Sequence, residues 1–173
     1  FSKSVLEILP IIEFFPDIIH VNDWQSALIP TYLKIGNFDE RYQNIKTILN
    51  IHNIQYQGRY GSQVLTDVCG IDPKHASILE CDGDVNILKG AIVTSDKIIT
   101  VSPSYAEEIK TPEHANGLHY IVNENASKLR GILNGLDYSF YNPETDKVIY
   151  TNFSVEDMTN KAKNKELLQK EMG

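Results

Sequence analysis

The sequence predicts an α/β fold, with a Rossmann-like, mostly parallel sheet and flanking helices. Two observations carry this prediction. Four short runs rich in Ile and Val each end in polar residues, which is typical of buried parallel strands. Segments with apolar residues at helical spacing separate these runs, and strands that alternate with helices favour a parallel sheet with right-handed crossovers. The length of 173 residues is enough to bury the core of one domain.

The expected strands are the four short apolar runs. They are residues 16–21, 47–51, 97–101 and 129–133. In an open parallel sheet, ligands bind outside the carboxyl ends of the strands. This rule nominates the polar residues that follow the runs, which are Asp23, His52, Asn53, Ser102 and Asn134.

Helical signals lie between the expected strands. Residues 4–15 are apolar at helical spacing and stop before Pro16. Residues 24–35 stop at Gly36, which suits a helix C-cap, and residues 86–94 form a third candidate.

Two more helices are expected in the second half of the chain. Residues 103–110 begin with Pro103, which suits a helix start; Ser104 with Glu107 fits a capping box, and Ser102 also reads as a cap. The last helix covers residues 155–172, with Ser154 as its N-cap.

Two stretches fit this alternation poorly. Residues 55–81 are long and rich in Gly and polar residues, and residues 111–128 are similar. Structureless loops of this length in a compact domain are usually functional or disordered. We therefore expect two long loops here.

Composition excludes several classes of function. The net charge of −7 argues against nucleic acid, because a surface that follows phosphates needs clustered Lys and Arg. No apolar run approaches the roughly 20 residues of a membrane span, so no membrane partner is expected. Cys69 and Cys81 are the only cysteines and do not form a CxxC motif, so neither a zinc site nor a disulfide framework is expected. A reducing cytoplasm fits this pattern.

The segment around Asp23 and Trp24 closes the first expected strand and opens a helix. The structural interpretation is that Asp23 caps the helix and Trp24 packs in the core. The functional interpretation is that Asp23 accepts hydrogen bonds from sugar hydroxyls while an aromatic ring stacks on a sugar face, because sugars present both hydroxyls and apolar C–H faces. Considered without any family resemblance, the residues of this segment slightly favour the structural interpretation.

Residues 51–58 form the densest polar constellation. His52, Asn53, Gln55 and Tyr56 stand at a strand end, and the segment closes with Gly58. Four hydrogen-bonding side chains favour a loop that binds polyols. GxGxxG, P-loop, HExxH and GxSxG motifs are all absent, and Asn134-Gly135 is first of all a turn signal.

Four motifs in order resemble bacterial glycogen synthase, of the starch synthase family of retaining GT-B glycosyltransferases. They read PDIIHVNDWQSALIPTYLK from Pro16, ILNIHNIQYQGRYG from Ile48, DGDVNILKGAIVTSDKIITVSPSYAEEI from Asp82 and LRGILNGLDYSFYNPETD from Leu129. The tail KAKNKELLQKEMG from Lys161 is similar to the family's link towards its second domain. The resemblance covers essentially the whole chain.

The resemblance implies two Rossmann-like domains with the active site between them. The implied reaction transfers glucose from ADP-glucose to the non-reducing end of an α-1,4-glucan with retention. ADP-glucose is then a substrate, and no cofactor or metal is implied. The chain would be a piece of the N-terminal domain without the family's Lys-x-Gly-Gly-Leu loop, and it would show little or no catalysis by itself.

The resemblance also implies roles for single residues. His52 matches the histidine beside the transferred glucose, where it would hold a sugar hydroxyl and place its carbonyl near the anomeric carbon. Asp23 would orient the acceptor or the transferred sugar. Trp24, Asn53 and Tyr56 would bind substrate. In addition, Asn134 falls in an Asn-Gly-x-Asp turn that faces the cleft. Asn22 stands where the family has a second histidine or an alanine.

By the same resemblance, residues 1–153 are part of the N-terminal glycosyltransferase domain and residues 154–173 form a helix that leads towards the C-terminal domain. Two alternatives stay open: a stand-alone α-glucan-binding module that uses the region of Asp23, Trp24 and His52, and a different GT-B glycosyltransferase. The sequence sets neither the nucleotide preference nor the oligomeric state.

Overall fold

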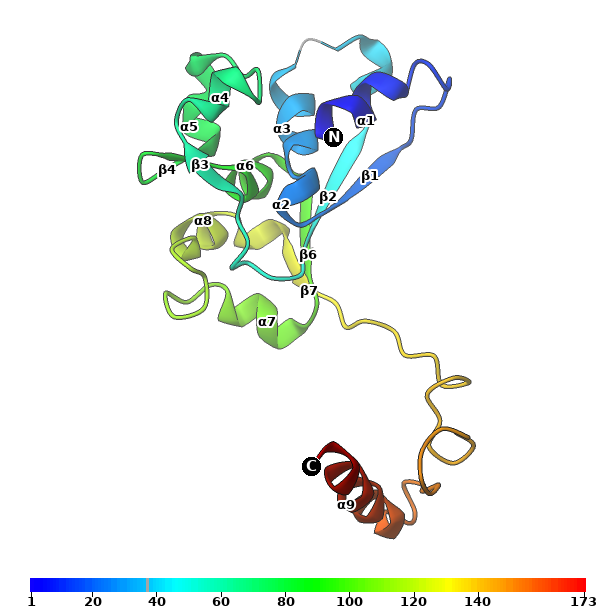
Figure 1. Ribbon diagram of the computed structural model, residues 1–173. Helices are drawn as coiled ribbons and strands as arrows, with labels where there is room; N and C mark the ends of the chain where they lie inside the picture. Colours follow the sequence, from blue (N-terminus) through cyan, green and yellow to red (C-terminus); the bar gives the residue numbers. More distant parts are fainter. Residues whose placement is uncertain (37) are drawn as a thin grey trace. The chain divides into compact units, whose positions relative to one another are not determined.

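Figure 1 shows the computed structural model, which describes residues 1–36 and 38–173. The chain divides into two compact units, Phe1–Leu133 and Asn134–Gly173. All the predicted site residues except Asn134 belong to the first unit.

The first unit is built on a four-stranded parallel sheet with the strand order β1-β2-β6-β7. The strands are β1 (Ile18–Asn22), β2 (Lys46–Ile51), β6 (Lys97–Thr100) and β7 (Leu129–Gly131). Each overlaps one of the four expected runs. The predicted α/β fold with a parallel sheet is therefore confirmed.

Register brings the ends of β1 and β2 together. Asn22 pairs with Asn50 across these strands, and Ile51 of β2 pairs with Thr100 of β6. Because the strands are parallel, the segments that follow β1 and β2 leave the same edge of the sheet. The two predicted motifs at Asp23 and His52 therefore become neighbours.

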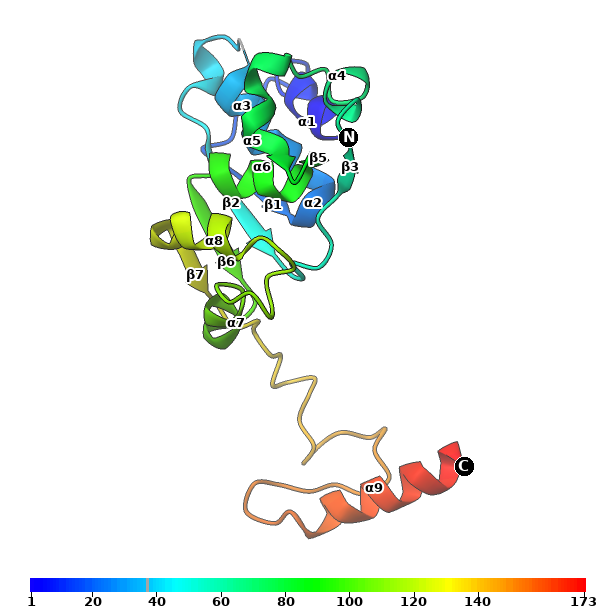
Figure 2. The same cartoon turned by 90° about the vertical axis from the view of Figure 1, so that its left-hand side faces the viewer.

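Helices cover one face of this sheet. They include α1 (Ser2–Ile8), α3 (Leu28–Ile35) and α6 (Ile87–Thr94), and Figure 2 shows α6 in front of the strands. The core between sheet and helices contains Leu49, Leu88 and Ile92, all fully buried. Asn86 caps α6 by accepting a hydrogen bond from the backbone of Lys89 at 3.0 Å, which fits the helix expected there.

Burial alternates along the strands instead of covering both faces. On β2, Thr47, Leu49 and Ile51 are buried, whereas Ile48 and Asn50 are only partly buried. Ile18 on β1 is 54% exposed. The expectation of fully buried strands is wrong for the second face of the sheet.

Two of the expected helices in the first half differ from the prediction, one in length and one in continuity. The helix expected over residues 4–15 is α1, which ends at Ile8, because Pro10 has no backbone N–H to donate to the carbonyl of Leu6 and its ring crowds that carbonyl. The helix expected over residues 24–35 is divided at Ala27 into α2 (Asp23–Ser26) and α3. Gly36 is the C-cap of α3, as predicted.

Capping differs in the second half. In α7 (Pro103–Glu108) the N-cap is Ser102, whose hydroxyl accepts a hydrogen bond from the backbone of Tyr105, so the capping box at Ser104 is wrong. The last helix is α9 (Thr159–Met172). It begins after Ser154, whose hydroxyl instead accepts hydrogen bonds from the backbones of Glu156 and Asp157.

The two expected long loops contain regular structure. Within and just after the first lies a small antiparallel sheet in the order β3-β5-β4, formed by β3 (Arg59–Gly61), β4 (Glu80–Cys81) and β5 (Asp84–Asn86). Two short helices, α4 (Val64–Asp67) and α5 (Ala76–Leu79), complete that segment. The second stretch contains α8 (His119–Glu124). The expectation of two structureless loops is therefore wrong.

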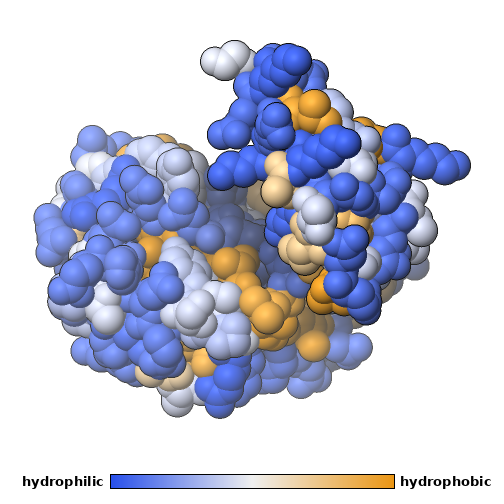
Figure 3. Space-filling model, turned by 90° about the horizontal axis from the view of Figure 1, so that it is seen from below, coloured by the Kyte–Doolittle hydropathy of each residue, from blue (hydrophilic) through white to orange (hydrophobic). Residues whose placement is uncertain are grey.

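Short 3-10 turns complete the first unit at Glu40–Tyr42, Pro73–His75 and Ala126–Lys128. In the second unit the regular element is α9, and many apolar side chains there are exposed, among them Leu136, Tyr138 and Phe140. Figure 3 shows such apolar patches on a mostly hydrophilic surface.

Within the described part of the chain, none of the helices has the length and apolar character needed to cross a bilayer.

Candidate functional site

The centre of the site is a hydrogen bond between the two motifs that follow β1 and β2. Oδ1 of Asp23 accepts a hydrogen bond from the backbone nitrogen of His52 at 2.8 Å. Hydrogen bonds to a carboxylate are among the stronger ones, so this contact fixes the start of the loop after β2 against the start of α2. The structure therefore brings together the two residues predicted to be catalytic.

Asp23 does not act as the helix cap that the structural interpretation expected. The N-cap of α2 is Asn22, which makes no side-chain capping bond, and Asp23 is the first helical residue. The backbone of Asp23 has a φ of 48°, in the left-handed region that non-glycine residues rarely adopt. Such strain clusters at functional sites, where the surrounding structure over-determines it.

The imidazole of His52 meets two asparagines. Its Nε2 lies 2.9 Å from Oδ1 of Asn22 and 2.9 Å from Nδ2 of Asn50. The two amides also meet each other, with Nδ2 of Asn50 donating to Oδ1 of Asn22 at 3.3 Å. Sequence reasoning did not nominate Asn50, although its register partner Asn22 and its spacing of two residues from His52 are the signal that could have found it.

Trp24 packs as the structural interpretation expected. Gly58 has a φ of 63°, and a Cβ atom there would lie only 2.5 Å from Cε3 of Trp24. The indole ring is therefore in close contact with the backbone at the end of the loop after β2. Its edge also meets Tyr60, with the ring centroids 6.1 Å apart.

Gln57 holds the loop from the inside. Its side chain is 6% exposed and donates to the carbonyl oxygens of Ile54 at 3.1 Å and Asn116 at 3.0 Å. Its Oε1 accepts a hydrogen bond from Asn86 at 2.7 Å. All of these hydrogen bonds of Gln57 are made within the protein, while the two residues before it, Gln55 and Tyr56, are exposed.

A shallow hollow of about 310 Å³ lies beside this loop. Its lining includes Trp24, Tyr56, Arg59 and Tyr60. Tyr56 is 61% exposed and Tyr60 is 41% exposed, so aromatic faces are available to a ligand. Aromatic faces beside polar groups suit a sugar ring, which has apolar C–H faces and hydroxyls.

The remaining predicted site residues differ in placement. Asn53 uses its Oδ1 to accept a hydrogen bond from the backbone of Gln55 at 2.9 Å, so it shapes the turn that presents Tyr56. Asn134 is exposed and is the first residue of the second unit, so its donor-side contact stays a prediction.

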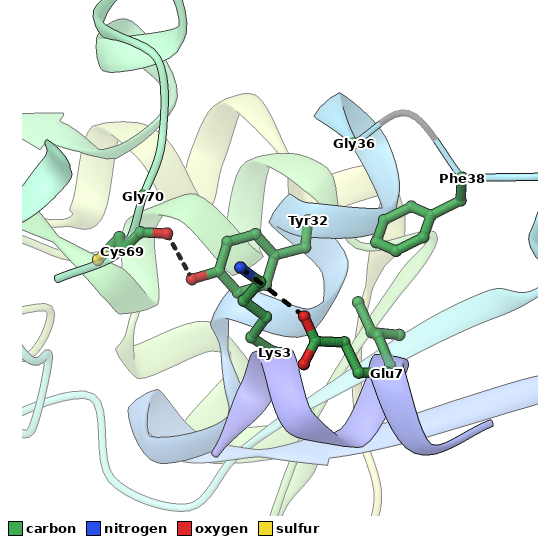
Figure 4. Close-up of a pocket in the computed structure, with 8 residues that line it drawn as sticks. Lys3, Glu7, Tyr32, Gly36, Phe38, Cys69 and Gly70 are labelled. Carbon is green, nitrogen blue, oxygen red and sulfur yellow. Dashed lines mark hydrogen bonds and ion pairs between the residues drawn. The ribbon is translucent and has the colours of Figure 1, made fainter. Parts of the chain in front are cut away.

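A separate cavity of about 190 Å³ lies away from these residues, against α1 and α3 (Figure 4). The hydroxyl of Tyr32 donates to the carbonyl oxygen of Cys69 at 2.8 Å there, and Lys3 faces Glu7 at 3.7 Å. Burial, together with the neighbouring Cys69, raises the pKa of Tyr32 to about 12. None of the predicted site residues lines this cavity.

Among residues 1–36 and 38–173, no group of three or more His, Cys, Asp or Glu side chains is placed to hold a metal ion. The Asp23–His52 site offers a carboxylate, an imidazole and two amides, which can form hydrogen bonds, orient a ligand and stabilise charge.

Three comparisons with known proteins point to one family. Residues 1–124 match the family model of the starch synthase catalytic domain. The chain is 47% identical to a glycogen synthase from Lachnospira eligens over 100% of its own length and 37% of that relative. It is 45% identical to a glycogen synthase from Clostridium perfringens, again over 100% of its length and 36% of the relative.

A solved structure matches as well. It is the catalytic domain of starch synthase IV from Arabidopsis thaliana bound to ADP and acarbose, with a TM-score of 0.78 and 34% identity. The match covers 99% of this chain and 36% of that one, so the chain spans little more than a third of the proteins it matches. By the match over residues 1–124, the chain belongs to the starch synthase catalytic domain family.

Proposed function

We propose that this chain supplies the acceptor-side part of a glycogen synthase. The complete enzyme would transfer glucose from ADP-glucose to the non-reducing end of an α-1,4-glucan and retain the anomeric configuration. Support comes from the two glycogen synthases that share 47% and 45% of their residues with the chain. The starch synthase bound to ADP and acarbose supports a nucleotide and a sugar ligand.

The observation that carries the proposal is the 2.8 Å hydrogen bond from the backbone of His52 to Asp23. It joins the two residues to which the resemblance gives roles at the transferred glucose. Because the backbone nitrogen of His52 is tied to a carboxylate, the position of its carbonyl and imidazole is set before a substrate arrives. Such preorganisation lowers the cost of forming the transition state.

The proposed chemistry is transfer on one face of the glucose. The bond from C1 of glucose to the β-phosphate oxygen of ADP breaks, and a bond from C1 to the acceptor hydroxyl oxygen forms. The proton of that hydroxyl passes to the departing phosphate. In this scheme His52 holds a sugar hydroxyl and faces the developing positive charge with its carbonyl, while Asp23 orients the sugar.

We place the acceptor glucan in the hollow beside Trp24, Tyr56 and Tyr60. The hollow measures about 310 Å³ and offers exposed tyrosine rings. Tyr56 would stack on a glucose unit, and Asn53 would contact the acceptor while it shapes the turn. On the donor side, Asn134 would face the nucleotide sugar.

For the domain organisation, we propose that residues 1–153 belong to the N-terminal catalytic domain and that residues 154–173 lead towards the C-terminal domain. The compact first unit ends at Leu133, so the proposed domain also includes residues 134–153 of the second unit. We also propose a cytoplasmic location, which fits two buried cysteines with free thiols.

The test is His52→Ala in a full-length synthase that contains this chain. Transfer of glucose from ADP-glucose to glycogen should fall by at least ~100-fold, the loss expected when a preorganised group at the reacting centre is removed. His114→Ala is the matched control, because His114 is exposed in the turn after α7. Near-normal turnover of the His52 variant would remove His52 from the reaction.

A stand-alone glucan-binding module is the alternative that the aromatic hollow favours. Titration of the 173-residue chain with maltooligosaccharides separates the two, because a module binds tightly without donor or further domain, whereas half of a cleft binds weakly. A full-length protein without any transferase activity that still bound glucan would establish the module.

A further inference from the structure

The imidazole of His52 is held by neighbours to which neither the family resemblance nor the proposed reaction gives a role. Both of its side-chain contacts are made at Nε2, to Oδ1 of Asn22 and Nδ2 of Asn50, each at 2.9 Å. In the part of the chain that the structure describes, no hydrogen bond reaches Nδ1. One nitrogen of the ring is therefore engaged by the protein, and the other is available to a ligand.

Sheet register explains why the three side chains meet. Asn22 and Asn50 pair across the parallel strands β1 and β2. Side chains two residues apart along an extended chain point to the same face, so His52 follows Asn50 on that face. Asn22 is the last residue of β1 and Asn50 is the second to last residue of β2, so both amides stand on strands, which are more rigid supports than the loop that begins at His52.

The backbone around the cluster is fixed as well. The backbone nitrogen of Asn22 donates to the hydroxyl of Ser26 at 2.8 Å, and that hydroxyl donates to the carbonyl of Asn22 at 2.7 Å. The backbone nitrogen of His52 donates to Asp23. The backbones of Asn22 and His52 are therefore each held by a hydrogen bond other than the one between their side chains.

The chemistry of the three groups indicates where the ring proton sits. An amide oxygen can only accept and an amide nitrogen can only donate, whereas a ring nitrogen can do either. With a proton on Nε2, Oδ1 of Asn22 accepts two hydrogen bonds, one on each lone pair. One comes from Nε2–H of His52, and the other comes from Nδ2 of Asn50 at 3.3 Å. With no proton there, Nε2 could accept from Nδ2 of Asn50, but its lone pair would face Oδ1 of Asn22 at 2.9 Å. With the proton on Nε2, Nε2 and Nδ2 are instead two donors that share this one acceptor.

We propose that Asn22 and Asn50 are positioning residues that hold the imidazole of His52 with its proton on Nε2, so that Nδ1 accepts a hydrogen bond from a substrate hydroxyl. The inference rests on the proposed function for the identity of the substrate, a sugar with free hydroxyls. It adds the direction of the hydrogen bond, because the sugar hydroxyl donates and the ring accepts.

The kinetic test uses Asn22→Ala and Asn50→Ala in the full-length synthase. A ring that is no longer held should lower kcat by about tenfold, since misplacement of a reacting group by even 1 Å costs up to ~100-fold. KM for glycogen should stay within about twofold, because the aromatic hollow is untouched. Asn44→Ala is the matched control, because Asn44 is exposed in the turn before β2.

The spectroscopic test reads the ring directly. The full-length enzyme is labelled with ¹⁵N in its histidine rings, and His52→Ala identifies the signals of His52. We expect a protonated Nε2 and an unprotonated Nδ1 in the unchanged enzyme near neutral pH, and a mixture of tautomers in Asn22→Ala. Asn22→Asp keeps an acceptor oxygen and should restore the single tautomer, even if Asn22→Ala fails to fold.

Two results would overturn the inference. One is a kcat within about twofold of the unchanged enzyme for both alanine variants, which would mean that the amides do not position a reacting group. The other is a proton on Nδ1 in the unchanged enzyme. The ring spectrum can be measured without catalysis, so the two proposals can fail separately. A protein that transfers no glucose would contradict the proposed function. The spectrum would still show which ring nitrogen of His52 carries the proton.

Discussion

At the scale of single residues, the site depends on contacts between residues far apart in the sequence. Asp23 could have capped α2, but its carboxylate accepts a hydrogen bond from the backbone of His52 instead. Trp24 lines the hollow, and its ring atoms Cε3 and Cδ2 also lie close to Gly58. The loop after β2 is therefore fixed at its start by Asp23 and at its end by Trp24.

Gly58→Ala tests the second of these contacts. Gly58 has a φ of 63°, and a new Cβ would lie 2.5 Å from Trp24 and 3.3 Å from Ile87. The strained backbone and the overpacking together should lower the free energy of unfolding by about 2–4 kcal/mol in urea denaturation.

Gly83→Ala is the control for this prediction. Gly83 has a φ of 85°, but nothing lies within 4 Å of the position its Cβ would take. This substitution should cost only the backbone strain, about 1–2 kcal/mol. Equal losses in the two variants would show that Trp24 does not pack closely on the loop.

At the scale of elements, side chains tie the small helices to the sheet and its covering layer. Gln57 and Asn86 join the loop after β2 to the start of α6 through a 2.7 Å hydrogen bond. Tyr32 of α3 similarly reaches the chain just after α4 through the carbonyl of Cys69 at 2.8 Å. The segment from 62 to 81 is therefore held in place although its own helices are short.

Tyr32→Phe tests the tie between α3 and α4, with a dependence on pH. Losing the hydrogen bond to Cys69 should lower the free energy of unfolding by about 1 kcal/mol at neutral pH. Burial raises the pKa of Tyr32 from 10.0 to about 12. The folded protein therefore keeps a proton that the unfolded chain loses, and stability present below pH 10 is lost as the pH rises towards 12.

Urea denaturation at several pH values measures this effect. Tyr32→Phe should show a smaller alkaline loss than the unchanged chain. Some loss should persist, because burial also raises the pKa of Tyr42, and a hydrogen bond with Cys81 raises that of Tyr120. Tyr138→Phe is the control, since Tyr138 is 76% exposed. An identical alkaline loss in Tyr32→Phe and Tyr138→Phe would contradict the prediction.

At the scale of the whole molecule, the buried core belongs to the first unit. The core residues run from Leu6 to Leu129, whereas α9 in the second unit contains no buried residue. The hydrophobic stabilisation of the chain therefore comes almost entirely from residues 1–133.

Truncation after Leu133 tests this division. Residues 1–133 should keep a cooperative thermal transition with a midpoint within about 4 °C of the full chain, a shift that corresponds to less than about 1 kcal/mol in a domain of this size. Limited proteolysis of the full chain should cut first between 134 and 158, where side chains are mostly exposed. Loss of the cooperative transition would show that the second unit contributes to the core.

The sequence by itself determined the fold class and the four strands, because apolar runs and their periodicity are local properties of the chain. It also nominated Asp23 and His52, since the ends of parallel strands share one edge. It could not recognise the small sheet of β3, β4 and β5, because such short strands carry weak local signals and packing decides their pairing.

Only the tertiary structure decided the partners within the site. The contact of Asn22 and Asn50 with the ring of His52 depends on register between two strands separated by 23 residues of chain, from Asn22 to Lys46. Register is set by the burial of one face against the helices, which is a property of the whole first unit. For the same reason, the burial of Gln57 and the exposure of the adjacent Tyr56 became clear only from the folded loop.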